Sequence, residues 1–361
     1  NIMGLKRKLL GVTTGAMLLC SMIGGSVLAA GHVMTGGNLQ IEKDVVLDGG
    51  SIVPNQKFSF KIEPLDVQPN TKENNLEVKK GKELQGADAI QSGQFDKDTQ
   101  TTDEGGKKVA KDTTAQFDFS GVQFEHNKPA IYRYKVSENA GQGTGMSYDN
   151  TKYQLDVYVD KDGNPTSLVA KKLNDQNQAE GEKVPLKFVN TYKTESLTVE
   201  KNVTGASGET EKAFEFHITV KENDSLKNGT AIQAKLHKAG TQTEDVQIVV
   251  GTEATFSLKS GEKLVVPELP KDTDYTLYET EHGQNGYTTT VTVNDQNKDN
   301  ADTNREYKVV ENTNKVVFTN NRDEITPTGI LLNVAPYAAG VILAAFAAVL
   351  FLAKKRRNRR A

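Results

Sequence analysis

The sequence predicts an all-β protein with two sandwich domains in series, and three observations support this fold class. Short segments rich in Val, Ile, Thr, Phe and Tyr alternate apolar and polar side chains, and Gly, Asn, Asp and Pro separate them. No helical period recurs between the two ends of the chain. The segments also return in the same order, which indicates two copies of one β-sandwich.

Four pairs of segments define the two copies. They are Leu39–Lys43 with Leu197–Lys201, Phe58–Ile62 with Phe214–Ile218, Tyr132–Glu138 with Thr273–Glu279, and Val184–Asn190 with Asn314–Asn320. We therefore expect a first domain over residues 31–193 and a second over residues 194–323. The second copy is shorter, and the polar stretch from Pro69 to Lys111 is expected to hold extra loops of the first.

Residues 1–30 are typical of a secretory signal peptide. Lys6, Arg7 and Lys8 precede an apolar run from Leu9 to Leu28, and the small pair Ala29–Ala30 closes it. Cleavage is expected after Ala29 or Ala30. The sequence therefore predicts a secreted protein.

Residues 324–361 hold a short polar segment, an apolar span and a basic tail. The span, Ile330–Ala353, has 24 residues without a charge, which is enough to cross a hydrocarbon core of about 30 Å. The tail Lys354–Arg360 is expected to stay on the cytoplasmic side, with everything before the span outside. This arrangement excludes a cytoplasmic enzyme. A permanent single-pass membrane protein is the alternative that the span alone leaves open.

The charge and the cysteine content exclude further classes of function. Nine of the 44 basic residues belong to the signal peptide and the basic tail, which hold no acid, so 35 basic residues face 47 acidic ones in the remainder, a net charge of −12. Such a chain has no basic surface for nucleic acid. Because the single cysteine, Cys20, lies in the signal peptide, no disulfide and no cysteine nucleophile are expected in the mature protein. No cofactor or metal is predicted either, because the five histidines have no partners at metal-ligand spacing: His32, His126, His217, His237 and His282.

Three polar residue types recur on strand faces that are otherwise apolar. Alternate side chains of a strand lie on the same face, so the apolar neighbours two positions away indicate the face a residue shares. By this test a lysine, a glutamate and an asparagine point inward near strand ends in each copy. They are Lys43, Glu138 and Asn190 in the first copy and Lys201, Glu279 and Asn320 in the second.

These residue types can form a covalent bond with one another. Burial is expected to lower the pKa of a lysine and to raise that of a glutamate, which leaves a neutral amine beside a neutral acid. Such an amine is a nucleophile, the asparagine carboxamide is the electrophile, and the acid can polarise the carbonyl and carry protons while ammonia leaves. The sequence therefore predicts one Lys-Asn isopeptide bond per domain, with Glu138 and Glu279 as the catalytic groups. The alternatives are polar side chains that reach solvent at strand ends, or a buried hydrogen-bonded triad.

A second motif stands directly before the apolar span. It consists of Ile325, Thr326, Pro327, Thr328 and Gly329. The Pro-Thr-Gly ending, the span and the basic tail together resemble the cell-wall sorting signal of Gram-positive bacteria, with the proline one position later than in Leu-Pro-x-Thr-Gly, as in variants used by pilus-type sortases. The resemblance implies that a sortase cleaves between Thr328 and Gly329 and holds Thr328 as a thioacyl intermediate.

With both motifs, the chain resembles the major backbone pilins of group A streptococci, the T-antigen or FctA-like type, whose domains have immunoglobulin-like (CnaB-like) folds. In that family an exposed lysine at the start of the last strand of the first domain accepts the threonine of the next subunit. The matching position is Lys183. The face count agrees, because Val184 is expected to point inward and its neighbour outward, but Lys187 and Lys193 are nearby competitors.

The resemblance implies a structural pilus subunit rather than an enzyme with an external substrate. A sortase would join Thr328 of one copy to Lys183 of the next. The implied partners are the sortase, other copies of the chain, minor pilins, the peptidoglycan cell wall and, in adhesion, a host-cell surface. The alternative is a monomeric wall-anchored adhesin or minor pilin.

Overall fold

The computed structural model describes residues 33–298 and 305–323. The predicted signal peptide, apolar span and sorting motif lie outside these residues. In the described part no helix is long and apolar enough to span a membrane. The chain divides between Thr194 and Glu195 into two compact units, and residues 223–226 group with the first of them.

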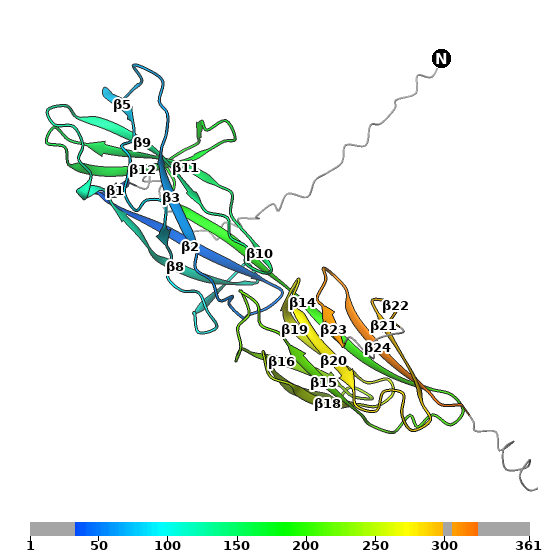
Figure 1. The fold of residues 1–361 in the computed structure, drawn as a ribbon. Coiled ribbons are helices and arrows are strands. Elements are labelled where there is room, and N and C mark those ends of the chain that lie inside the picture. The colour runs from blue at the N-terminus through cyan, green and yellow to red at the C-terminus, as the bar shows by residue number, and fades with distance from the viewer. Residues whose placement is uncertain (1–32, 299–304, 324–361) are drawn as a thin grey trace, which may run out of the picture. The chain divides into compact units, whose positions relative to one another are not determined.

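Among its described residues the first unit has two β-sheets (Figure 1) and one 3-10 helix. Its elements are β1 (Val33–Thr35), β2 (Asn38–Asp48), β3 (Ser59–Pro64), β4 (Lys72–Glu73), β5 (Leu76–Lys80), β6 (Ile90–Gln91), β7 (Thr101–Glu104), β8 (Lys107–Asp118), η1 (Phe119–Gly121), β9 (Ala130–Glu138), β10 (Met146–Ser147), β11 (Lys152–Val159), β12 (Pro165–Leu173), β13 (Ala179–Glu180) and the first part of β14 (Lys187–Thr204). One sheet has the order β1-β12-β11-β9-β3-β6, and in the other β14, β2, β8 and β7 follow one another.

The second unit repeats this plan with fewer strands. Its elements are the last part of β14, then β15 (Phe214–Val220), β16 (Ala231–His237), β17 (Thr243–Val249), β18 (Ala254–Leu258), β19 (Lys263–Pro270), β20 (Asp274–Glu279), β21 (Thr288–Val293), β22 (Gln296–Asn297), β23 (Glu306–Lys308) and β24 (Asn314–Asn321). One sheet joins β17, β16, β19, β14, β24 and β21, and the other has the order β18-β15-β20-β23. The predicted all-β class is confirmed.

In each unit the strand that carries the lysine lies beside the last strand and runs parallel to it. In the first unit β2 pairs with β14, so that Lys43 lies level with Phe188. In the second unit β14 pairs with β24, so that Lys201 lies level with Phe318. Both units therefore bring the two ends of their chain segment together in the same register.

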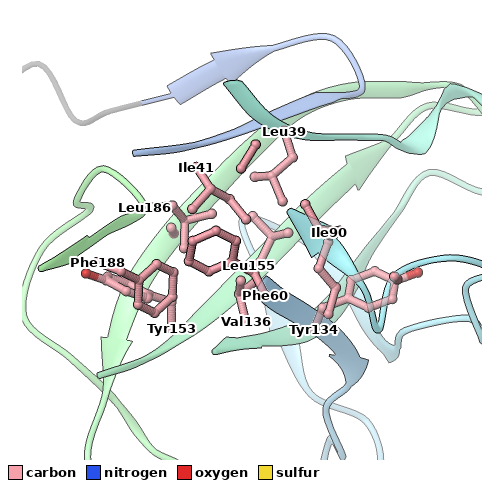
Figure 2. Packing of buried hydrophobic residues seen from close by; sticks show 14 of the residues in the cluster. Leu39, Ile41, Phe60, Ile90, Tyr134, Val136, Tyr153, Leu155, Leu186 and Phe188 are labelled. Carbon is pink, nitrogen blue, oxygen red and sulfur yellow. The ribbon is translucent and has the colours of Figure 1, made fainter. Parts of the chain in front are cut away.

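The core of the first unit lies between its two sheets. Figure 2 shows Leu39 and Ile41 of β2 facing Phe60 of β3 and Leu155 of β11, and all four side chains are fully buried. The rings of Phe60 and Phe188 lie 5.1 Å apart, so aromatic contacts link the two sheets near the lysine-bearing strand. This apolar layer removes the water that would otherwise solvate any polar group pointing inward.

The stretch Pro69–Lys111, expected to hold extra loops, also contains strands. Strands β4 to β7 lie in this stretch and β8 begins in it, and β8 pairs with β2 along most of its length. Only scattered residues of β8, such as Val109 and Ala115, are buried. Its lysines and threonines face outward, which is why the segment appears polar in the sequence.

Replacing a fully buried leucine tests the placement of this core. We expect Leu155→Ala to lower the free energy of unfolding of the first unit by about 2–5 kcal/mol, because it removes apolar contacts and leaves a cavity. The exposed Lys152 on the same strand provides the control, and Lys152→Ala should change stability by less than about 0.5 kcal/mol. Urea denaturation followed by circular dichroism measures both, and equal effects would contradict the assignment.

Candidate functional site

The predicted residues of the first unit meet at one buried point. Lys43 Nζ lies 2.9 Å from Glu138 Oε2, and the Nδ2 of Asn190 donates a 2.8 Å hydrogen bond to Glu138 Oε1. The side chains of Lys43 and Glu138 are fully shielded from solvent, and so is Asn190. One carboxyl group thus contacts the candidate nucleophile with one oxygen and the candidate electrophile with the other.

The second unit has the same arrangement at the equivalent strands. Lys201 Nζ lies 2.8 Å from Glu279 Oε2, and Asn320 Nδ2 donates a 2.6 Å hydrogen bond to Glu279 Oε1. All three residues are 0% exposed. The structure therefore brings together each predicted trio, and none of the six side chains reaches solvent as the strand-end alternative required.

The two lysines are not at strand ends, as the sequence suggested. The strand β2 continues past Lys43 to Asp48, and β14 continues past Lys201 to Thr204. Buried side chains follow each lysine at Val45 and Val203. A lysine inside a strand on a covered face has no route to solvent, so its amine must find a partner inside the domain.

Parallel pairing fixes the position of each asparagine relative to its lysine. Since Lys43 is level with Phe188, Asn190 lies on the same face, two residues further along β14. Lys201 is level with Phe318, and Asn320 again lies two residues further along β24. The glutamates occupy equivalent ends too, because Glu138 and Glu279 are the last residues of β9 and β20.

An aromatic ring covers each lysine amine. Lys43 Nζ lies 4.7 Å from the centroid of the Phe58 ring, and Lys201 Nζ lies 4.4 Å from that of Phe214. Such a ring attracts a cation weakly and also excludes water from it. These two residues were not predicted as part of the site, although they occupy matching positions in the repeated segments.

Burial shifts the protonation equilibria of the trio. Desolvation lowers the pKa of Lys43 to about 8, although the nearby Glu138 carboxylate opposes the shift. Desolvation also raises the pKa of Glu138. In the second unit the pKa of Lys201 falls to about 8, again mainly because of burial. At a given pH, a far larger fraction of these lysines than of a solvated lysine therefore carries the neutral amine needed for nucleophilic attack.

The carboxamide oxygens face donors other than the glutamates. The backbone N–H of Asp149 donates to Asn190 Oδ1 at 2.8 Å, and the hydroxyl of Thr289 donates to Asn320 Oδ1 at 2.7 Å. The sequence analysis expected the acid to polarise the carbonyl. In the structure the carboxyl group instead contacts the amide nitrogen, which is the group that would leave.

Comparison with known proteins gives the family. A Spy0128-like isopeptide containing domain (FctA) matches residues 39–193, and a domain of unknown function, DUF7601, matches residues 195–322. A pilin of Streptococcus pyogenes serotype M1 is 33% identical over 332 residues, which are 90% of this chain and 92% of that protein. The chain belongs to the pilin family.

Solved structures agree with this assignment. The crystal structure of the major pilin from Streptococcus pyogenes matches the fold of this pilin with a TM-score of 0.65 and 28% identity, over 81% of this chain and all of the solved one. A pilus tip adhesin from Streptococcus pyogenes, Cpa, is 34% identical over 138 residues, 38% of this chain but 18% of the adhesin. The predicted resemblance to major pilins of the FctA type is confirmed.

The predicted acceptor lysine of this pilin is exposed. Lys183 lies between β13 and β14, ahead of the strand at whose start it was expected. Its neighbours Val184 and Leu186 turn toward the core, as the face count required. Of the competitors, Lys187 is half-buried and forms an ion pair with Asp44 at 2.6 Å. The other member of the predicted intersubunit link, Thr328, lies outside the described residues, as do Ile325, Thr326, Pro327 and Gly329.

The lowered pKa of Lys43 predicts a pH dependence of stability in Asn190→Ala, a variant that lacks the asparagine carboxamide. In Asn190→Ala, Lys43 keeps its buried site and titrates near pH 8, whereas the unfolded lysine titrates at 10.5. Between these values the unfolded state binds more protons, so the free energy of unfolding of the first domain should rise with pH, by about 3 kcal/mol in all.

Urea denaturation from pH 8 to 10.5 measures this slope. The double variant Lys43→Met, Asn190→Ala provides the control, because it lacks the titrating amine but keeps every other ionisable group of the domain. A rise of equal size in the double variant would contradict the assignment to Lys43.

Proposed function

We propose that each domain of this pilin forms one isopeptide bond within itself, from Lys43 to Asn190 and from Lys201 to Asn320. The observation that carries the proposal is the bridging carboxyl group. In each domain one buried glutamate lies within 3 Å of both a lysine amine and an asparagine carboxamide nitrogen. The lysine and the asparagine lie on parallel neighbouring strands. A hydrogen-bonded triad alone would leave two buried lysines with depressed pKa values and no function for them.

The reaction needs no cofactor to balance. The lone pair of the lysine Nζ attacks the asparagine Cγ, and the carbonyl π electrons move to Oδ1. The glutamic acid takes a proton from Nζ with one oxygen and gives its own proton to Nδ2 with the other, so the acid is regenerated. When the electrons return from Oδ1, the bond from Cγ to Nδ2 breaks and ammonia leaves. One C–N bond has formed and one has broken.

The proposed bonds would give each domain the role that a disulfide plays in other secreted proteins. They close segments of 147 and 119 positions, from Lys43 to Asn190 and from Lys201 to Asn320. Closing a loop of about 100 residues in the unfolded chain is worth about 5 kcal/mol in the chain-entropy model. Because each bond joins a strand near the start of its domain to the last strand, tension along the chain would pass through the bond rather than unravel the sheets.

We further propose that a sortase polymerises the chain into a pilus on the surface of a Gram-positive bacterium. The acyl group of Thr328 would pass to the amine of Lys183 on the next copy, and the finished polymer would be attached to the cell wall together with minor pilins. The exposure of Lys183 supports this role, and so does the match to a pilin along 92% of that protein. A monomeric wall-anchored adhesin is less well supported, because the match to the tip adhesin covers only 18% of it.

Mass spectrometry of the intact ectodomain tests the internal bonds. Each bond expels one ammonia, so the wild type should be lighter than its calculated mass by about 34 Da, and Glu138→Ala or Glu279→Ala by about 17 Da after correction for the substitution. The two variants control for each other, since each leaves the other domain intact. A wild-type chain at its full calculated mass would overturn the proposal.

Denaturing gels of cell-wall extracts test the intersubunit link. We expect the wild type to give a ladder of covalent polymers and Lys183→Ala to give a monomer only, because the acceptor amine is lost. Lys187→Ala and Lys193→Ala are the matched controls and should keep the ladder. A ladder that persists in Lys183→Ala and disappears in one of the controls would move the acceptor to that lysine.

A further inference from the structure

The two domains of this pilin hold their asparagine carbonyl oxygens in different ways. In the second domain the donor is a side chain, the hydroxyl of Thr289, at 2.7 Å from Asn320 Oδ1. In the first domain it is the backbone N–H of Asp149, at 2.8 Å from Asn190 Oδ1. The proposed reaction places developing negative charge on this oxygen, so whatever donates to it acts on the transition state.

We propose that Thr289 is a catalytic residue of the second domain, donating to the carbonyl oxygen of Asn320 as the amine of Lys201 attacks, and that the backbone N–H of Asp149 does this for Asn190 in the first. The inference rests on the proposed isopeptide reaction and deepens it. Two groups then have separate roles: the glutamate transfers protons at the two nitrogens, and the separate donor stabilises the carbonyl oxygen.

The position of Thr289 is set by the sheet. In the antiparallel pairing of β21 with β24, Thr289 lies directly opposite Asn320. Side chains of such a pair are about 5 Å apart at Cβ, close enough for a short hydroxyl to reach the carboxamide. The contact therefore follows from strand register and requires no mobile loop.

The direction of the Thr289 hydrogen bond is fixed by a second contact. The backbone N–H of Gly283 donates to the Thr289 hydroxyl oxygen at 3.0 Å. With a lone pair engaged in this way, the hydroxyl directs its own proton to Asn320 Oδ1, and the two bonds polarise each other in the same sense. The donor is thus oriented before the reaction begins, which is what electrostatic stabilisation of an oxyanion requires.

In the first domain the carboxylate of Asp149 positions the backbone donor. Its Oδ2 accepts from the N–H of Val189 at 2.7 Å, and its Oδ1 accepts from the N–H of Thr151 at 2.8 Å. These bonds tie the segment before β11 to the residue next to Asn190. Asp149 is therefore a positioning residue through its side chain, and the catalytic contact is made by its backbone.

The rate of bond formation in each domain tests the assignment. A short pulse of expression is followed by quenching at intervals, digestion, and mass spectrometry of the cross-linked peptides. The rate at which the Lys43–Asn190 bond forms in the same chains is the internal reference for the Lys201–Asn320 bond. The rate is counted per folded second domain, measured by protease resistance of the same samples. We expect Thr289→Val to slow the Lys201–Asn320 bond about a hundredfold and to leave the Lys43–Asn190 bond unchanged.

Two further variants separate catalysis from folding in the second domain. Thr289→Ser keeps a hydroxyl and should stay within a few-fold of the wild type. Thr290→Val changes an exposed threonine on the opposite face of β21 and should have no effect. An unchanged rate in Thr289→Val overturns the inference, whereas absence of both bonds in the wild type overturns the proposed reaction itself.

The first domain provides a parallel test of positioning. Asp149→Ala and Asp149→Asn both remove the negative charge, but the asparagine keeps a side-chain oxygen that can accept from Val189. We expect Asp149→Ala to slow the Lys43–Asn190 bond and Asp149→Asn to restore most of the rate. Equal rates in the two variants would assign the effect to the charge and overturn the positioning role.

Discussion

The buried carboxyl group that contacts the lysine-bearing strand and the last strand of each domain constrains the structure around it. A glutamate, a lysine and an asparagine without solvent contact are costly unless each polar atom has a partner. The glutamate meets this demand with one oxygen on each neighbour, and the ring of Phe58 or Phe214 covers the amine. The sheets must therefore close tightly at this point, and the aromatic layer of the core lies beside it.

Strand register is the second constraint, because the trio depends on it entirely. A slip of one residue in the pairing of β2 with β14 would turn Asn190 to the other face of the sheet, away from Glu138. The first domain also has an irregularity in β8 opposite the stretch from Ile41 to Lys43. Bulges of this kind are frequent beside reactive sites, where they adjust the direction of a side chain.

Much of the fold and the whole trio could be predicted from the sequence, because both follow a period of two. Lys43 and Asn190 share faces with apolar neighbours, and their counterparts repeat this in order, which a chance pattern would not do. The strand β8 could not be predicted in the same way. It pairs with β2 but buries only scattered residues such as Val109 and Ala115, so its outward lysines and threonines give the segment a polar sequence without the alternation of a strand. The assignment of residues 191–195 to strand β14 was equally hidden, since the repeat placed a boundary between two domains there.

The carbonyl donors show why the rest of the site could not be predicted from the sequence. The proposed amide formation would need an amine, a carboxamide and a proton carrier, and these three residue types recur in both copies. It prescribes only some N–H or O–H near the carbonyl oxygen, and the two domains satisfy this with different atoms, a backbone amide at Asp149 and a hydroxyl at Thr289. A backbone donor cannot be recognised from residue type, because every residue except proline has a backbone N–H. Threonine is common in strands, and only the pairing of β21 with β24 shows that Thr289 lies opposite Asn320. Repetition therefore identifies the groups that the proposed reaction would consume or regenerate, and register identifies the groups that would stabilise its transition state.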